Sequence, residues 1–301
     1  MARSDTPSLS KDVLQPKTLI AFALAGFLAG GNAVAIRISN EELAPMWGAA
    51  VRFFFAAVIL FAVVRILRLS LPRGRALIGA SLYGLLNFGL AFGFIYWGLL
   101  EVTAGTAMVV LATVPLLTLI FAVIFGLERL TLRGIAGALV AASGIVLIFR
   151  DSISSASPAS MTALLCGAAS MAASPIVVKT FPRVHAVCQN AVGMLVGSAM
   201  LLLASWALVE PHGLPVNGRT QLALAYLVIL GSIGVFLLFM YLLRRMTASA
   251  TNYIMLIAPL AAVFLGSLLL SETIGAVFLV GSGLVLCAVF IGALMGHKAD
   301  R

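Results

Sequence analysis

Ten apolar segments, each about as long as a lipid bilayer is thick, dominate this chain of 301 residues. A helix needs about 20 apolar residues to cross the hydrocarbon core. Division at charges, prolines and Gly/Ser clusters predicts helices at roughly 18–36, 44–66, 76–99, 103–126, 132–149, 159–179, 185–209, 220–243, 249–270 and 274–295. The segments are apolar on all sides, as membrane spans are. They lack the polar alternation of barrel strands.

The composition excludes the soluble classes of protein. Hydrophobic residues make up 62% of the chain and charged residues 10%, and the mean hydropathy is +1.15. A soluble domain needs about a quarter of its residues charged, and a disordered chain needs low hydrophobicity. We therefore predict an all-α polytopic membrane protein. No cleavable signal-peptide pattern precedes the first apolar segment.

The basic residues indicate how the helices are oriented. With the N-terminus inside, 15 Lys and Arg residues lie on the cytoplasmic side and three outside, while Arg52 lies within a span. Lys and Arg collect in cytoplasmic loops, so we expect both termini in the cytoplasm. The same rule accounts for the net charge of +9 without nucleic acid. The three cysteines lie in apolar segments and show neither disulfide nor metal spacing.

The chain contains an internal repeat. A shift of 144 residues aligns, without gaps, Phe92 with Phe236, Thr103-Ala104 with Thr247-Ala248, Pro115-Leu116 with Pro259-Leu260, Glu128 with Glu272 and Gly137 with Gly281. A shift of 142 aligns the Gly31–Arg37 segment with Ala173–Lys179. Ten helices thus divide into two sets of five, and because five is odd, the second set enters the membrane from the opposite side.

This division predicts the domain organisation. We expect a tail at 1–17, a first five-helix repeat at 18–150, a linker at 151–158, a second repeat at 159–295 and a tail at 296–301. Many secondary transporters consist of two inverted repeats, with the substrate site near the midplane between them. We expect a central cavity there.

Several motifs resemble a known family. They are Gly31-Asn32 and Arg37, Arg52-Phe53, Tyr96-Trp97-Gly98-Leu99 before Thr103-Ala104, Pro115, Glu128-Arg129-Leu130-Thr131 with Gly134 and Gly137, and the weaker Ser271-Glu272-Thr273 with Gly281. Over roughly 18–295 the chain resembles the drug/metabolite transporter superfamily, in its ten-helix EamA-type branch, and is most similar to amino acid exporters of the YddG type. The second copy has no arginine matching Arg52. The resemblance implies two inverted five-helix halves and export of amino acids or small metabolites from the bacterial inner membrane.

Polar and adaptable side chains within spans mark candidate cavity residues, because polar groups in lipid need partners or a pathway. The candidates are Asn32, Tyr83, Asn87, Thr106, Met108, Ser170, Ser174, Asn252 and Met255. Each has a structural alternative. Asn32 can form an interhelical hydrogen bond, the serines can bond their own helix, and methionine often fills packing gaps. Tyr96 and Trp97, at an outer helix end, are typical of the aromatic belt at the membrane surface.

Other residues are expected to shape or gate the helices. They are Arg52, Pro115, Pro175, Pro259, Glu128 and Glu272. For Arg52 we favour an anchor that bonds carbonyls of a neighbouring helix over a surface for a carboxylate. Pro115 and Pro259 occupy equivalent positions and can form a fixed kink or a hinge. The two glutamates each suit the start of the following helix.

We expect a monomeric exporter of amino acids and related small metabolites that works by alternating access, without catalytic residues, cofactor or metal. No Asp, Glu or His lies mid-span, which favours facilitated diffusion over the alternative, a proton-coupled drug/metabolite antiporter. A membrane-embedded enzyme would need a nucleophile with a base, or a metal cluster. A channel would need rings of charges or carbonyls.

Overall fold

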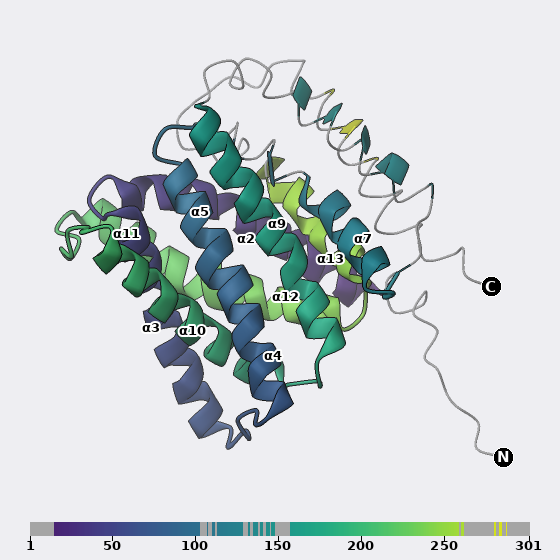
Figure 1. Ribbon diagram of the computed structural model, residues 1–301, viewed down its shortest axis with the longest axis horizontal. Coiled ribbons are helices and arrows are strands. Elements are labelled where there is room, and N and C mark those ends of the chain that lie inside the picture. The colour runs from purple at the N-terminus through teal and green to yellow at the C-terminus, as the bar shows by residue number, and fades with distance from the viewer. Residues whose placement is uncertain are drawn as a thin grey trace.

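The described part of the chain is helical. A computed structural model describes residues 15–102, 113–128 and 157–258, together with scattered residues between 107 and 147 and between 260 and 287. Within these residues every regular element is a helix (Figure 1). This agrees with the predicted all-α class.

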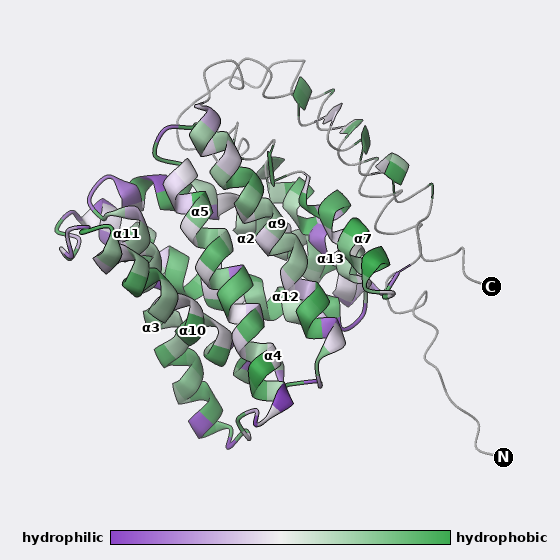
Figure 2. Ribbon diagram, viewed as in Figure 1, coloured by the Kyte–Doolittle hydropathy of each residue, from purple (hydrophilic) through white to green (hydrophobic). Residues whose placement is uncertain are grey.

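Six helices in the described residues are long and apolar enough to cross a membrane. They are α2 (Pro16–Asn40), α3 (Pro45–Ile66), the continuous run α4 (Arg75–Gly84), η1 (Leu85–Leu90) and α5 (Ala91–Gly98), then α9 (Pro158–Thr180), α10 (Ala186–Ala207), and the run α11 (Gly218–Val228), η2 (Ile229–Gly234) and α12 (Val235–Leu243). Hydrophobic residues cover these helices, and hydrophilic residues gather at the connections (Figure 2). Two shorter helices, α7 (Val114–Ile124) and α13 (Ala248–Asn252), belong to the fourth and ninth predicted spans.

The boundaries of the six long helices reproduce the internal repeat. Both η1 and η2 are π-helical, and they are 144 residues apart at both ends. The starts of α2 and α9 are 142 residues apart, and α3 and α10 are 141 apart at both ends. A π-helical turn disturbs the regular hydrogen bonding of an α-helix and is frequent at functional sites. The two copies therefore share an irregularity as well as a sequence pattern.

Equivalent helices of the two copies pack against each other. The pair α3 and α10 forms the most extensive helix contact. Glu210, just after α10, accepts hydrogen bonds from the backbone N–H groups of Met46 and Trp47 at the start of α3. At the other end, the Cys188 Sγ lies 3.6 Å from the carbonyl oxygen of Ser70, just after α3. Helices α3 and α10 are thus antiparallel.

Several of the other contacts occur in pairs. Helix α5 packs on α9, and its equivalent α12 packs on α2; likewise α4 packs on α10 and α11 on α3. Close approach needs glycine at one crossing, because a Cβ on Gly84 would lie 2.3 Å from the carbonyl oxygen of Gly193. Each contact and its partner are related by exchanging the two copies, which is the pattern of a pseudo-twofold axis.

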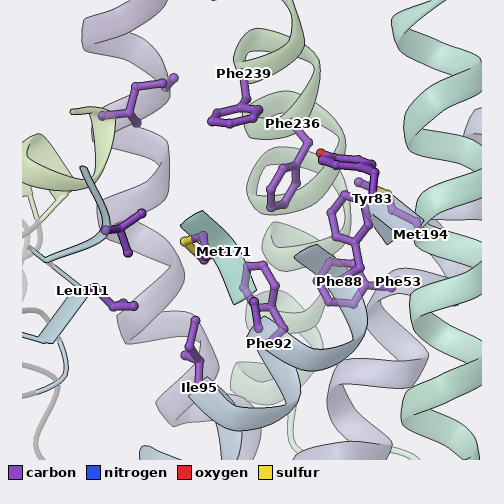
Figure 3. Packing of buried hydrophobic residues seen from close by; sticks show 14 of the residues in the cluster. Phe53, Tyr83, Phe88, Phe92, Ile95, Leu111, Met171, Met194, Phe236 and Phe239 are labelled. Carbon is purple, nitrogen blue, oxygen red and sulfur yellow. The ribbon is translucent and has the colours of Figure 1, made fainter. Parts of the chain in front are cut away.

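Aromatic rings fill the space beside this crossing. The rings of Phe53, Phe88, Phe92 and Phe236 form a chain with centroid separations of 4.7–5.9 Å (Figure 3). Tyr83 adds an edge-to-face contact with Phe88. These rings come from helices of both copies, so they join the two halves.

Three local features differ from the predicted spans. Helix α2 continues to Asn40, so Arg37 lies in its last turn. Pro115 stands at the second position of α7 and not in a helix interior, because the chain turns at Thr113. The predicted helix 249–270 is interrupted at Tyr253, where α13 ends before residues 254–258 become helical again. Pro115 suits the first turn of α7, because the N–H that proline lacks would have no partner within the helix there.

Candidate functional site

A cavity of about 70 Å³ lies among α2, η1, α5, α9, α12 and the interrupted segment around Tyr253. One ordered water needs roughly 10–15 Å³ by a comparable measure, so the space holds more than one. The described lining is Ala29, Asn32, Ala33, Ile36, Asn87, Phe92, Ile95, Leu99, Ala107, Leu111, Met171, Val235, Phe236, Phe239, Asn252, Ile254, Met255 and Ala258. Figure 3 shows Phe92, Phe239, Ile95, Leu111 and Met171 around this region. Three asparagines supply the polar groups of an otherwise apolar wall.

Asn32 is held by the π-helical segment of the second copy. Its Nδ2 donates to the carbonyl oxygen of Gly231 at 3.2 Å. Glycine is required at this point, since a Cβ on Gly231 would lie 2.0 Å from the Asn32 Oδ1. The π-helical geometry of η2 and the absence of a side chain thus let the α2 side chain reach the η2 backbone.

The same carbonyl is also bonded by Arg52. The guanidinium is fully buried, and its Nη2 lies 2.9 Å from the Gly231 oxygen. Its Nε donates to the Ser232 hydroxyl at 2.8 Å, and its Nη1 lies 3.5 Å from the Tyr96 hydroxyl. Its carbon Cζ is 4.9 Å from the ring centroids of both Phe53 and Phe92. Arg52 therefore connects three elements behind the cavity wall.

Asn87 has the equivalent position in the first copy. Its place in η1 matches that of Gly231 in η2, and Ser174 on α9 matches Asn32 on α2. The Ser174 hydroxyl lies 3.0 Å from the Asn87 Oδ1. In both copies, therefore, a polar contact joins the π-helical segment to the first helix of the other copy.

The Ser174 hydroxyl makes a hydrogen bond in place of the one that Pro175 cannot make. A proline has no N–H to donate to the carbonyl four residues earlier, which here is that of Met171. The Ser174 hydroxyl lies 3.0 Å from this Met171 oxygen and supplies the missing donor. One hydroxyl proton thus serves two acceptors. The Asn87 Oδ1 is thus the side of the amide that faces Ser174.

Asn252 completes the polar set from the last turn of α13. Its Nδ2 donates to the Thr118 hydroxyl on α7 at 2.7 Å. The Thr118 hydroxyl in turn donates to the carbonyl of Val114, one turn earlier in α7. Asn252 therefore stands where a helix is interrupted, the kind of place at which transporters bind polar substrate groups.

Two amide atoms in the wall have no hydrogen-bond partner among the described residues. They are the Asn32 Oδ1 and the Asn87 Nδ2, both buried. A buried polar group without a partner costs roughly 1–3 kcal/mol. A ligand with complementary polar groups would offset this cost.

The structure places the predicted cavity residues in two groups. Asn32, Asn87, Asn252 and Met255 line the cavity. Tyr83, Ser170 and Ser174 are absent from its described lining. Tyr83 is fully buried against Phe88, and its hydroxyl bonds the Asn190 Oδ1 instead. Ser174 lies behind Asn87, which takes its place in the wall.

The remaining predicted residues divide by what the structure describes. Thr106, Met108, Pro259 and Glu272 lie outside the described residues. Glu128 follows α7 in a bend and is an electrostatic neighbour of Lys179 at the end of α9. The expected role in an aromatic belt is wrong for Tyr96, which lies near the end of α5 but is fully buried beside Arg52. Trp97 next to it is 38% exposed.

Sequence reasoning missed the apolar side of the cavity. Phe92, Phe236, Phe239 and Met171 line it. Only the alignment of Phe92 with Phe236 between the repeats singled out two of them, because phenylalanine is common throughout the spans. Gly231 and Ser232 were also missed, since the sequence carries no sign of a π-helical turn.

The comparisons with known proteins agree with this architecture. The model of the EamA-like transporter family matches residues 16–150 and again 159–293. An uncharacterized inner membrane transporter of Escherichia coli, YedA, is 31% identical over 88% of this chain and 87% of its own length. An uncharacterized transporter of Archaeoglobus fulgidus is 27% identical over 91% of this chain and 98% of its own.

A solved crystal structure shares the fold. Its TM-score is 0.79 at 18% identity, and the match covers 95% of this chain and 100% of that one. The two family matches fall on the two copies of the repeat, and the resemblance inferred from the sequence is confirmed. The chain is a member of the EamA-like transporter family, within the drug/metabolite transporter superfamily.

Proposed function

We propose that the protein exports amino acids and related small metabolites across the bacterial inner membrane. In this proposal it is a monomer of ten helices, with both termini in the cytoplasm. Membership of a transporter family supports transport of a small molecule.

The three asparagines of the cavity carry the proposal. An amino acid presents an ammonium donor and a carboxylate acceptor on one carbon. Asn32 has an unpartnered acceptor oxygen, and Asn87 has an unpartnered amide nitrogen. The aromatic and aliphatic wall suits an apolar side chain. A pocket of this kind, mostly apolar with a few fixed polar groups, is typical of small-molecule sites.

Alternating access is supported by the pairing of contacts between the copies. The antiparallel packing of α3 on α10 is what two inverted five-helix halves would produce. Several contacts of one half, such as α5 on α9, have an equivalent in the other, such as α12 on α2. Closing one set while opening its equivalent would move the cavity from one side of the membrane to the other.

Facilitated diffusion is favoured over the proton-coupled alternative. Coupling to protons needs a titratable group in the substrate pathway. The described lining of the cavity contains no Asp, Glu, His or Lys. A gradient of the substrate alone would then drive export.

Flux through proteoliposomes tests the proposal. We expect the purified protein to move members of an amino acid panel down their gradients. Asn32→Ala and Asn87→Ala should each lower the flux at least about threefold, the worth of one hydrogen bond. Gln221→Ala, which removes an exposed amide, is the matched control.

Two outcomes would overturn parts of the proposal. If a broad panel of amino acids and metabolites shows no protein-dependent flux in either direction, the exporter assignment fails. If an imposed pH gradient drives accumulation of substrate against its own gradient, the proton-coupled antiporter replaces facilitated diffusion.

A further inference from the structure

A second cavity, of about 130 Å³, lies where three spans end on one side of the molecule. It is lined by Val178, Lys179, Arg183, Val184, Gln189, Met240, Leu243 and Arg244. Lys179 is next to the last residue of α9, Gln189 stands in the first turn of α10, and Leu243 ends α12. The cavity is therefore at the level where spans meet lipid headgroups.

Three of its lining residues are cations, and the described lining contains no carboxylate. Lys179 Nζ donates to the carbonyls of Leu243 and Met246, and Arg244 donates to the carbonyl of Val184. These bonds fix the two cations. Lys179 also has Glu128 as an electrostatic neighbour, whereas Arg244 keeps further N–H donors. Arg183 is exposed and makes no ion pair with a described residue.

Gln189 is an independent indication of a ligand. The residue is only 5% exposed and lines the cavity. No described residue forms a hydrogen bond with its side chain. A buried carboxamide is rarely left without a partner, and here the cavity is where a partner can bind. The amide adds a neutral donor to the three cations.

The positive charge of Arg183 is not a requirement of the fold. Through the 142-residue shift, Arg183 and Val184 correspond to Glu41 and Glu42 at the opposite end of the first copy. There the carboxylate of Glu42 accepts hydrogen bonds from the backbone of Val216 and Asn217. At the acidic end the carboxylate is thus occupied by backbone N–H groups of the protein itself, whereas the basic end has an open cavity.

We propose that this cavity binds the phosphate of an anionic phospholipid headgroup. Phosphate oxygens suit a guanidinium fork, an ammonium and an amide N–H. Basic pockets between spans at a cytoplasmic surface recognise such headgroups. The apolar lining from Val178, Met240 and Leu243 suits the glycerol and the start of the acyl chains. That the headgroup belongs to the inner leaflet rests on the proposed orientation of the protein. Binding of the headgroup itself depends neither on that orientation nor on the proposed transport.

Thermal unfolding of the full chain in a neutral detergent tests the site. We expect dioctanoyl phosphatidylglycerol to raise the unfolding temperature saturably, and dioctanoyl phosphatidylcholine not to. Arg183→Gln and Gln189→Leu should each weaken the apparent affinity about fivefold. The second variant changes no charge, so it separates the site from general attraction. Arg65→Gln with Arg73→Gln, exposed residues outside the cavity, is the control for lost charge and should leave the affinity unchanged.

Three results would overturn the proposal. Equal weakening in the control and in the cavity variants would assign the effect to general charge. Equal stabilisation by soluble glycerol phosphate would identify a free phosphate compound as the ligand. No saturable effect of phosphatidylglycerol on the wild type would show that no such site exists. Native mass spectrometry of retained lipid gives a second readout for each variant.

Discussion

Arg52 is a buried cation whose hydrogen-bond and ring partners in the described part of the chain are all neutral. A charge at the centre of a span costs roughly 3 kcal/mol on insertion scales. Here the guanidinium is bonded to the Gly231 carbonyl and the Ser232 hydroxyl, and two phenylalanine rings lie beside it. Charge-assisted hydrogen bonds and cation–π contacts offset the cost of burial. The side chain therefore stabilises the packing of α3 against η2, as an anchor does.

Replacement of Arg52 should destabilise the protein strongly. Arg52→Ala leaves an empty volume and removes the charged donors from Gly231 and Ser232, so we expect a loss of about 3 kcal/mol in the free energy of unfolding. Arg52→Lys should fall between Ala and wild type, because a single ammonium cannot reproduce the planar fork. Thermal unfolding in detergent measures both. An effect of Arg52→Ala no larger than that of Arg219→Ala, whose side chain is 63% exposed, would contradict the anchor role.

Residue chemistry decides which parts of the cavity could be predicted from the sequence. Asn32, Asn87 and Asn252 stand out because amides within spans need partners. Tyr83 has the same polar character but finds its partner in Asn190, away from the cavity. Phe236 and Phe239 resemble many other phenylalanines in the chain, so only the three-dimensional arrangement identifies them as lining residues.

At the scale of elements, most ends of the long helices were predictable, whereas helix irregularities were not. The predicted span 44–66 corresponds to α3 at Pro45–Ile66, since proline and charge mark both ends. The π-helical turns η1 and η2 lie within uninterrupted apolar sequence. Because these helices are hydrophobic on all sides, the sequence has no periodicity whose change could mark the π-helical turns. The repeat alone indicates that such a turn, once present in one copy, occurs in the other.

The start of α9 depends on a carboxylate from another element. Ser160 Oγ donates to Glu101 Oε2 at 2.8 Å. Hydrogen bonds from Ser160 first and Ser157 second hold the pKa of Glu101 below its ordinary value. Glu101 follows α5, so this contact fastens α5 to the first turn of α9 on the side we propose to be external.

The stability that Glu101 adds should depend on pH. A lowered pKa in the folded state means that the ionised form stabilises the fold above the unfolded-state pKa, and that this stabilisation is lost as the pH falls through the folded-state pKa. Wild type should therefore unfold at a higher temperature than Glu101→Gln at about pH 6, and the difference should shrink as the pH falls below 4.5, the ordinary pKa of a glutamate. Glu41→Gln, at an exposed ion pair, is the control. A difference that persists at low pH would contradict this account.

At the scale of the whole molecule, the two copies share one set of contacts with opposite chemistry at their ends. Glu42 and Glu210 accept hydrogen bonds from backbone N–H groups at one end of the bundle, while Lys179 and Arg244 donate to carbonyls at the other. A pseudo-twofold relation would place equivalent positions on opposite sides of a membrane. The positive-inside tendency then explains why Arg183 and Arg245 at the basic end correspond to Glu41 and Glu101 at the acidic end.

Accessibility of single cysteines tests this arrangement. With Cys166, Cys188 and Cys287 replaced by alanine, we expect Gly213→Cys to react with an impermeant maleimide in intact cells. Arg73→Cys should react only after permeabilisation, because Gly213 follows α10 at its acidic end and Arg73 follows α3 at the basic end of the bundle. Cysteines at Ser8 and Lys298 should behave like Arg73→Cys if both termini are cytoplasmic. Labelling of the two termini from opposite sides would require an odd number of spans, and two five-helix halves could not produce it.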